Sequence, residues 1–150
     1  MQKFSLFVLL CAAAFAYPSQ AQSISAVQSL AFGSFAAGGS GTVTISAAGA
    51  RTQGGGVILV PSASGSAATF NVSGNANATY AITLPGNGVV SLTSGANSMA
   101  VNSFTSSPAT VGQLSGGGSQ TLSVGATLSV GSNQASGSYG GSFDVTINYN

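Results

Sequence analysis

The stretch "QTLSVGATLSVGS" (residues 120–132) constrains the fold more than any other part of the sequence. Its apolar side chains recur at every second position, and small or polar residues occupy the positions between them. A period of two places successive side chains on opposite faces of an extended chain. We therefore predict a long β-strand whose buried face carries Leu122, Val124, Ala126, Leu128 and Val130.

Several shorter stretches show the same alternation, and turn residues such as Gly and Pro separate them. They are "GTVTIS", "AATFNVSG", "TYAITLPG" and the C-terminal "GSFDVTINYN". A continuous apolar run, Val57 to Val60, is typical of a strand that is covered on both faces. No segment after residue 22 has a helical period. The pattern predicts an all-β protein with an immunoglobulin-like, Greek-key β-sandwich.

Charged residues are nearly absent from the chain. They make up 2% of the sequence, against about a quarter in an ordinary globular protein, and they are Lys3, Arg51 and Asp144. After the first segment, the apolar runs are much shorter than the roughly 20 residues that a membrane-spanning helix needs. We therefore expect a neutral exported protein without a membrane span in its mature part.

The first residues have the pattern of a secretory signal peptide. Lys3 supplies the positive end, "FSLFVLLCAAAFA" is the apolar region, and Pro18 ends it. Small residues at Ser19 and Ala21 then favour cleavage after Ala21, with cleavage after Ala16 as the alternative.

This interpretation divides the chain into a signal peptide, residues 1–21, and a single β-sandwich domain, residues 22–150. The one cysteine, Cys11, falls in the signal peptide, so the mature chain has no cysteine. Export would place the protein in the periplasm and then at the cell surface or outside the cell.

The inventory of side chains argues against catalysis. The sequence has no His and a single carboxylate, Asp144. A nucleophilic triad needs a base, glycosidases need two carboxylates, and zinc or iron sites need His, Cys or several acids. We therefore expect no enzyme activity, no metal and no cofactor. A neutral surface also lacks the basic stripe that nucleic acids require.

We interpret Arg51 as a solvated turn residue, and Asp144 as solvated or as a charge that discourages wrong pairing of the last strand.

Three stretches resemble a secreted bacterial family, domain-of-unknown-function family 4402. They are "LAFGSFAAGGSGTVTISAAGARTQGGG", "FNVSGNANATYAITLP" and "GGSQTLSVGATLSVGSNQASGSYGGSFDVTINYN". The resemblance covers residues 30–150, and it supplies no function.

The C-terminal strand also resembles that of chaperone–usher pilin subunits. These subunits carry a Gly fourteen residues from the C-terminus and a penultimate aromatic residue, positions that Gly137 and Tyr149 occupy here. Alternating apolar residues lie between them, at Phe143, Val145 and Ile147. The resemblance implies a sandwich that lacks one strand. A strand of a periplasmic chaperone would fill the space first. At an outer-membrane usher, the N-terminal extension of the next subunit would then replace the chaperone strand. The residues named would form the subunit interface.

The segment 22–29 is the candidate donor extension, and Ile24, Ala26 and Leu30 share one face. Gln28 interrupts that face. We therefore expect a secreted, non-enzymatic fibre or pilus subunit that associates with itself by strand donation. The alternative is a monomeric, adhesin-like surface or matrix-binding domain in which residues 24–32 complete the sheet within the same chain.

Overall fold

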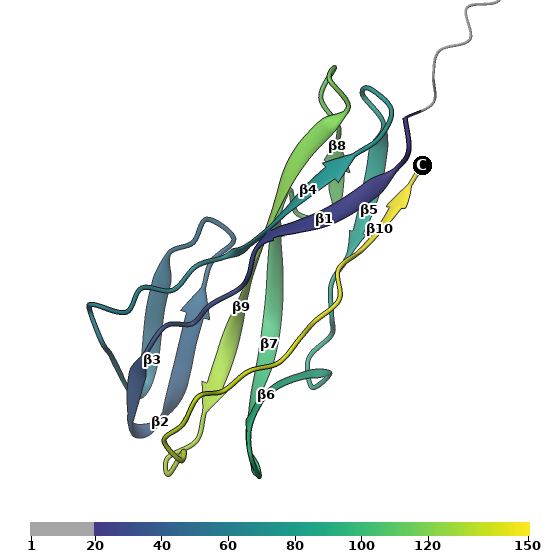
Figure 1. The fold of residues 1–150 in the computed structure, drawn as a ribbon. Coiled ribbons are helices and arrows are strands. Elements are labelled where there is room, and N and C mark those ends of the chain that lie inside the picture. Colours follow the sequence, from purple (N-terminus) through teal and green to yellow (C-terminus); the bar gives the residue numbers. More distant parts are fainter. Residues whose placement is uncertain (1–19) are drawn as a thin grey trace, which may run out of the picture.

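The computed structural model describes residues 20–150, so the predicted signal peptide lies outside the described residues except for its last two positions. The described residues form ten β-strands and no helix (Figure 1). The strands are β1 (Ser23–Gln28), β2 (Phe35–Ile45), β3 (Arg51–Leu59), β4 (Ala68–Ser73), β5 (Thr79–Thr83), β6 (Val90–Ser94), β7 (Asn97–Ser107), β8 (Val111–Gln113), β9 (Ser119–Val130) and β10 (Thr146–Tyr149). None of the described segments is a helix long and apolar enough to cross a membrane.

The larger sheet is built around β9. Leu128 of β9 pairs with Val43 of β2 on one edge and with Val101 of β7 on the other. β4 and β2 pair with the same edge of β9, β4 along the first half of β9 and β2 along the second half. Three outer strands extend the sheet, because β1 pairs with β4, β3 with β2, and β6 with β7.

The smaller sheet contains β10, β5 and β8 in that order, and all its pairings are antiparallel. The two sheets enclose the core, so the predicted all-β sandwich is confirmed. The prediction for β9 is also confirmed, because its five alternating apolar residues are at most 4% exposed. They divide between two apolar clusters, one with Val43 and Val101 and one with Val72 and Tyr80.

The prediction that both faces of the run Val57–Val60 are covered is wrong. Val57 is buried, but 60% of Ile58 is exposed. The physical reason is that only the face of β3 that carries Val57 packs on the core, whereas none of the described residues buries Ile58 on the other face. A continuous apolar run does not distinguish a central strand from an edge strand.

Candidate functional site

One side of the sandwich has two strand edges that face each other without pairing. Among the ten described strands, β1 pairs only with β4, and β10 pairs only with β5. The two strands run close together along this side (Figure 1), and at one end the Tyr149 hydroxyl donates a hydrogen bond to the Ser73 carbonyl (2.7 Å). We call this region the open side, with β1 as one border and the extended residues 140–149 as the other.

In the segment 140–149, the backbone N–H and C=O groups of the even-numbered residues point toward the sheets of the same chain. Gly140 exchanges two hydrogen bonds with Thr93 of β6 (2.8 and 3.0 Å), and the Asn150 N–H donates to the Thr79 carbonyl (3.1 Å). In an antiparallel ladder, the residues between such positions direct their N–H and C=O groups to the other edge. The backbone N–H and C=O groups of the odd-numbered residues 141–149 therefore point toward the open side. No described strand pairs with that edge.

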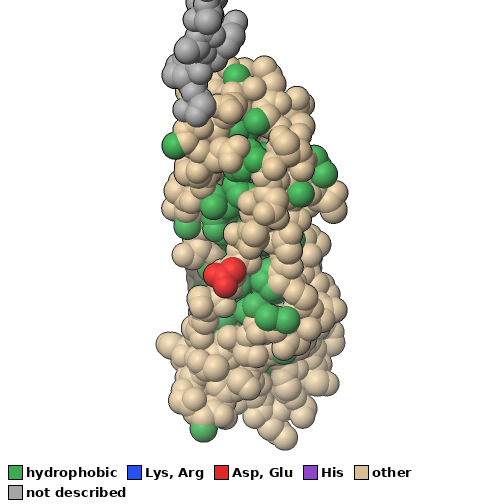
Figure 2. Space-filling view, turned by 90° about the vertical axis from the view of Figure 1, so that its right-hand side faces the viewer, with side chains coloured by type: hydrophobic (Ala, Val, Ile, Leu, Met, Phe, Trp, Pro, Cys, Tyr) green, Lys and Arg blue, Asp and Glu red, His purple; other side chains and the backbone are tan. Residues whose placement is uncertain are grey.

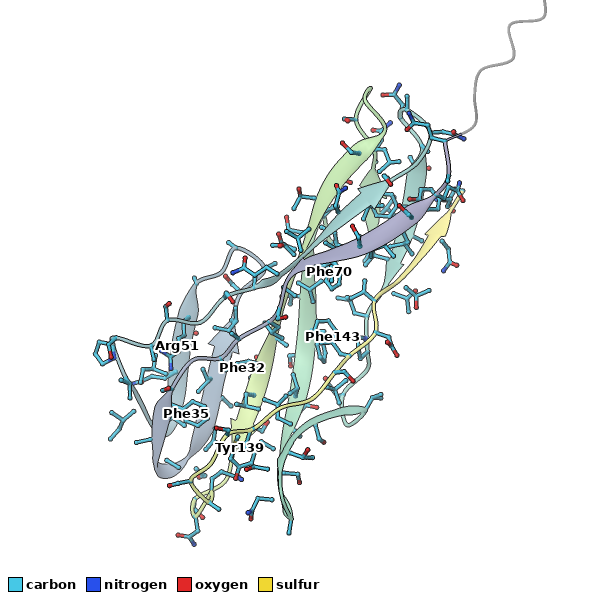
Figure 3. The ribbon with its side chains drawn as sticks, viewed as in Figure 1. Phe32, Phe35, Arg51, Phe70, Tyr139 and Phe143 are labelled. Carbon is cyan, nitrogen blue, oxygen red and sulfur yellow. The ribbon has the colours of Figure 1, made fainter. Side chains whose placement is uncertain are left out.

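The side chains of the same segment alternate as the sequence predicts. Phe143, Val145, Ile147 and Tyr149 are half-buried, whereas Ser142, Asp144, Thr146 and Asn148 are exposed. Phe143 lies at the middle of the segment and points toward Phe70 (Figure 3). The ring centroids of Phe143 and Phe70 are 6.4 Å apart, and those of Phe143 and Phe104 are 5.1 Å apart. The apolar face of this segment packs on the core but remains partly in contact with water.

Tyr149 closes one end of the open side. Its ring lies 5.9 Å from that of Tyr80, whose hydroxyl donates to Gln120 Oε1 (2.6 Å). Burial raises the pKa of Tyr80, and the nearby Tyr149 raises it further. Burial also raises the pKa of Tyr149, partly offset by a hydrogen bond from the Ser23 backbone. Both hydroxyls therefore stay neutral and act as hydrogen-bond donors.

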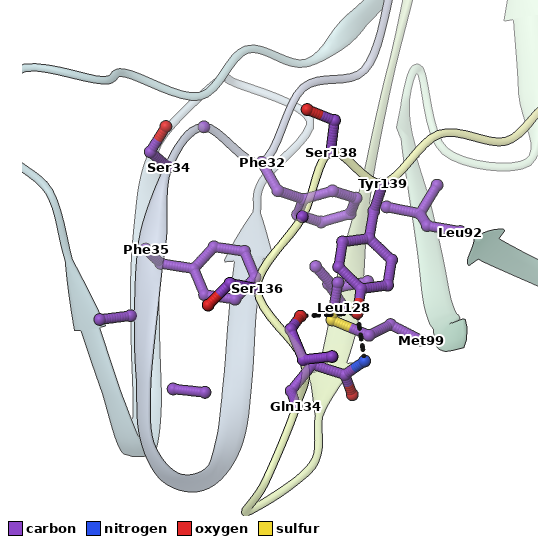
Figure 4. A pocket seen from close by; sticks show the side chains of 15 residues that line it. Phe32, Ser34, Phe35, Leu92, Met99, Leu128, Gln134, Ser136, Ser138 and Tyr139 are labelled. Atoms are coloured by element: carbon purple, nitrogen blue, oxygen red, sulfur yellow. Dashed lines mark hydrogen bonds between the residues drawn. The ribbon is translucent and has the colours of Figure 1, made fainter. Parts of the chain in front are cut away.

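Two cavities continue along the open side away from Tyr149. The nearer one, of about 330 Å³, lies between β1 and residues 140–143 and is lined by Ala26, Leu30, Phe70 and Phe143 among others. The farther one, of about 640 Å³, has the rings of Phe32, Phe35 and Tyr139 around it (Figure 4).

Tyr139 lines both cavities, together with Phe32 and Leu92. Its hydroxyl donates to the Ala135 carbonyl (2.7 Å) and accepts from Gln134 Nε2 (2.8 Å). These bonds hold the loop that forms the outer wall of the farther cavity. The aromatic residues Phe32, Phe35, Phe70 and Tyr139 were not predicted as site residues, because they come from three segments that are far apart in the sequence.

The predicted interface residues do not all lie together. Ile147 and Tyr149 are in β10, and Phe143 and Val145 are in the extended segment before it. Gly137 lies in the loop that precedes this segment, against the Ser94 side chain of β6. The terminal strand therefore pairs over a shorter length than expected, and Gly137 is not part of it, because the chain bends through a loop before it becomes extended.

The predicted donor residues lie in this chain's own sheet. Ile24 and Ala26 belong to β1 and pair with Val72 and Phe70 of β4. Ile24 is half-buried, Ala26 is exposed, and Leu30 packs against both apolar clusters. The segment 22–29 is therefore not a free extension in this structure, since the edge of β4 offers it backbone partners.

Arg51 is not the solvated turn residue that we expected. It begins β3, and its guanidinium donates to the carbonyls of Ser34 (2.5 Å), Val60 (3.3 Å) and Ala63. These bonds tie the loop after β3 to the start of β2, and the buried Nε has no hydrogen-bond partner within residues 20–150. Within residues 20–150, no three His, Cys, Asp or Glu side chains come together as metal ligands.

Comparison with known proteins gives a family but no function. Searches of curated proteins and of solved structures return no match. Residues 23–149 match the sequence profile of a family described as a domain of unknown function, DUF4402. That match spans all ten strands, from the start of β1 to the end of β10. The chain therefore belongs to the DUF4402 family.

Proposed function

We propose that this protein is a secreted, non-enzymatic structural subunit whose copies assemble into a fibre by donating a β-strand. The observation that carries the proposal is the open side, where the outward edge of residues 140–149 has no backbone partner among residues 20–150 and its apolar side chains are half-exposed. Hydrophobic side chains form an elongated band along this face of the molecule (Figure 2). An unpaired edge next to an apolar band is suited to the addition of one more strand.

An added strand would find two kinds of partner there. The odd-numbered residues 141–149 offer backbone donors and acceptors at alternate positions. The cavities of about 330 and 640 Å³ offer space for side chains that point inward from the added strand. Backbone hydrogen bonds would supply affinity, and the side chains in the cavities would supply specificity.

We assign the added strand to β1 of a second copy. β1 is weakly held in its own chain: five of its six residues are exposed, and its pairing with β4 has an irregularity between Ala26 and Gln28. In a fibre, each copy would release β1 to its neighbour and receive another β1 between β4 and the 140–149 edge. The received strand would then pair with an edge that is unpaired in the isolated chain.

The proposal includes the cellular route that the pilin resemblance implies. The signal peptide would direct the chain to the periplasm. A chaperone strand would occupy the open side until assembly, and an outer-membrane usher would bring the copies together at the cell surface. A chaperone is useful in such a route because half-exposed apolar side chains favour aggregation.

One observation favours a second function, that of a monomeric surface or matrix-binding domain. β1 already completes the larger sheet by pairing with β4 of its own chain. If this pairing persists outside the cell, the exported protein remains a monomer, and the open side binds a ligand instead of a strand.

A disulfide that locks β1 tests the proposal. Ser23 and Ser73 are cross-strand partners whose hydroxyl oxygens are 2.7 Å apart, so Ser23→Cys with Ser73→Cys should close a disulfide between β1 and β4. Thr44 and Thr127 form a similar pair (2.9 Å) between β2 and β9, and their double Cys variant is the matched control. No other cysteine is present after Cys11.

We expect the exported β1-locked variant to remain monomeric in sedimentation and electron microscopy until a reductant opens the disulfide. The β2–β9 control should assemble with its disulfide closed. Fibres of the locked variant with an intramolecular disulfide would rule out donation of β1. A wild-type protein that stays monomeric at every concentration, with its secretion partners present, would favour the monomeric domain.

A further inference from the structure

We infer that Asp144 prevents the open edge of residues 140–149 from pairing with the same edge of a second copy. Asp144 is the only acidic residue of the sequence, and it is exposed. Figure 2 shows the one acidic side chain within the band of hydrophobic side chains on this face. The inference depends on the open edge alone and goes beyond strand donation by β1.

The alternation of the backbone limits how two such edges can pair. Only the odd-numbered residues direct N–H and C=O groups outward, so each hydrogen-bonded pair must join two odd-numbered residues. Suppose that two copies pair their edges around a two-fold axis and keep both apolar faces on the same side of the new sheet. Each residue then lies opposite a residue of the same parity, odd opposite odd and even opposite even. Few registers satisfy both conditions over the whole edge.

The two registers with the longest overlap both bring the Asp144 carboxylates together. In the first, residue 143 pairs with residue 145, and Asp144 lies directly opposite Asp144 of the second copy in a non-hydrogen-bonded pair, the closer type. In the second, Asp144 lies opposite Thr146, and the two carboxylates are diagonal neighbours. Directly opposite Cβ atoms are about 5 Å apart and diagonal neighbours about 7–8 Å, and like charges at such positions destabilise a sheet.

The position of the charge, and not the net charge, is the essential point. The side chains of residues 20–150 carry one positive charge, Arg51, and one negative charge, Asp144. Loss of the Asp144 charge would move the net charge away from zero, which by itself opposes self-association. Removal of the repulsion between the paired edges should instead favour self-association. The two explanations can therefore be separated by one substitution.

The test uses the β1-locked variant with its Ser23–Ser73 disulfide, since no β1 can be exchanged there and any dimer must have another origin. Asp144→Asn removes the charge at nearly constant shape, and Asp144→Glu retains it. Asp144→Asn with Asn97→Asp restores the net charge at an exposed position at the start of β7. Dimerisation is measured by analytical ultracentrifugation, and the contact by amide hydrogen exchange at residues 143, 145 and 147.

We expect Asp144→Asn to strengthen dimerisation at least about 10-fold, since like charges placed together at an interface strongly disfavour it. The double variant should behave in the same way, and Asp144→Glu should remain monomeric. The three amides should exchange more slowly in the dimer. The inference is overturned if Asp144→Asn does not dimerise, if the double variant returns to monomer, or if exchange at these amides does not change. None of these outcomes depends on fibre formation.

Discussion

Two long edges of the sandwich, at β3 and at residues 140–149, differ in how their outward backbone groups are satisfied. At β3, Gln53 Oε1 accepts a hydrogen bond from the Leu59 N–H (3.0 Å), a group that points away from β2. Among the described residues, no side chain bonds the backbone of residues 141–149, and Thr93 Oγ1 reaches only the Gly140 carbonyl (3.5 Å), which already faces β6.

The backbone of the two edges differs as well. Near Gly55, which has φ +66°, β2 and β3 lose regular register, and the strands approach so closely that only glycines fit. Irregular, self-capped edges resist pairing with other chains. Residues 140–149 instead form an extended edge with a regular alternation of half-buried and exposed side chains. The comparison indicates that one edge is closed by its own residues and that the other is available.

The largest expected effect comes from a charge on the apolar face of the available edge. Ile147→Asp should lower the free energy of unfolding by about 3 kcal/mol, or prevent secretion, because the carboxylate would enter the core. We expect Val145→Asp to act similarly. The matched control is Ile58→Asp in β3, where the side chain is 60% exposed and the change should be within about 0.5 kcal/mol. Equal urea midpoints for Ile147→Asp and Ile58→Asp would contradict the assigned faces.

A smaller effect is expected where β2 and β3 approach each other. Gly55→Ala should cost about 2 kcal/mol, because φ is positive and the new methyl would meet the Ser40 carbonyl and the Gly41 Cα. Gly116→Ala is the control, since its methyl would meet nothing within 4 Å. Chemical denaturation measures both. If Gly55→Ala costs no more than the control, close packing does not shape the β3 edge.

Tyr149→Phe tests the closed end of the open side. Loss of the hydrogen bond to the Ser73 carbonyl should cost about 1 kcal/mol, because that contact is partly buried. The control Tyr139→Phe removes the hydroxyl that donates to the Ala135 carbonyl and accepts from Gln134 Nε2. It should cost less, because water can replace the exposed contact to Ala135 and Gln134 Nε2 keeps its bond to the Ser98 carbonyl. Thermal and urea unfolding compare the two variants. A larger loss for Tyr139→Phe would show that the loop of the farther cavity, and not Tyr149, holds this side.

The smallest expected effect concerns the cap on β3. Gln53→Ala should reduce stability by about 0.5 kcal/mol, since water can replace the lost acceptor at an exposed edge. The more sensitive measurement is amide exchange at Leu59, which should become faster. Gln53→Glu keeps an acceptor oxygen and should preserve the slow exchange. Unchanged exchange in Gln53→Ala would mean that the two edges do not differ in this respect.

Residue patterns predicted much of the fold and part of the candidate site. The period of two in β9 identified its buried face, because an alternating strand in a sandwich has one face on the core. The same pattern identified the half-buried side chains from Phe143 to Tyr149. It failed at Ile58, since an apolar residue on an edge strand has the same sequence appearance as one on a central strand.

The sequence by itself determined an all-β chain with amphipathic strands, three charged side chains and no His. Tertiary structure alone decided which strands are neighbours: β1 pairs with β4, Gly137 lies in a loop, and no described strand pairs with the outward edge of residues 140–149. The physical reason is that the alternation of side chains is a local property of an extended chain, whereas strand pairing joins segments far apart in the sequence. Ser23 and Ser73, fifty residues apart, are paired, and whether such contacts form depends on the whole fold.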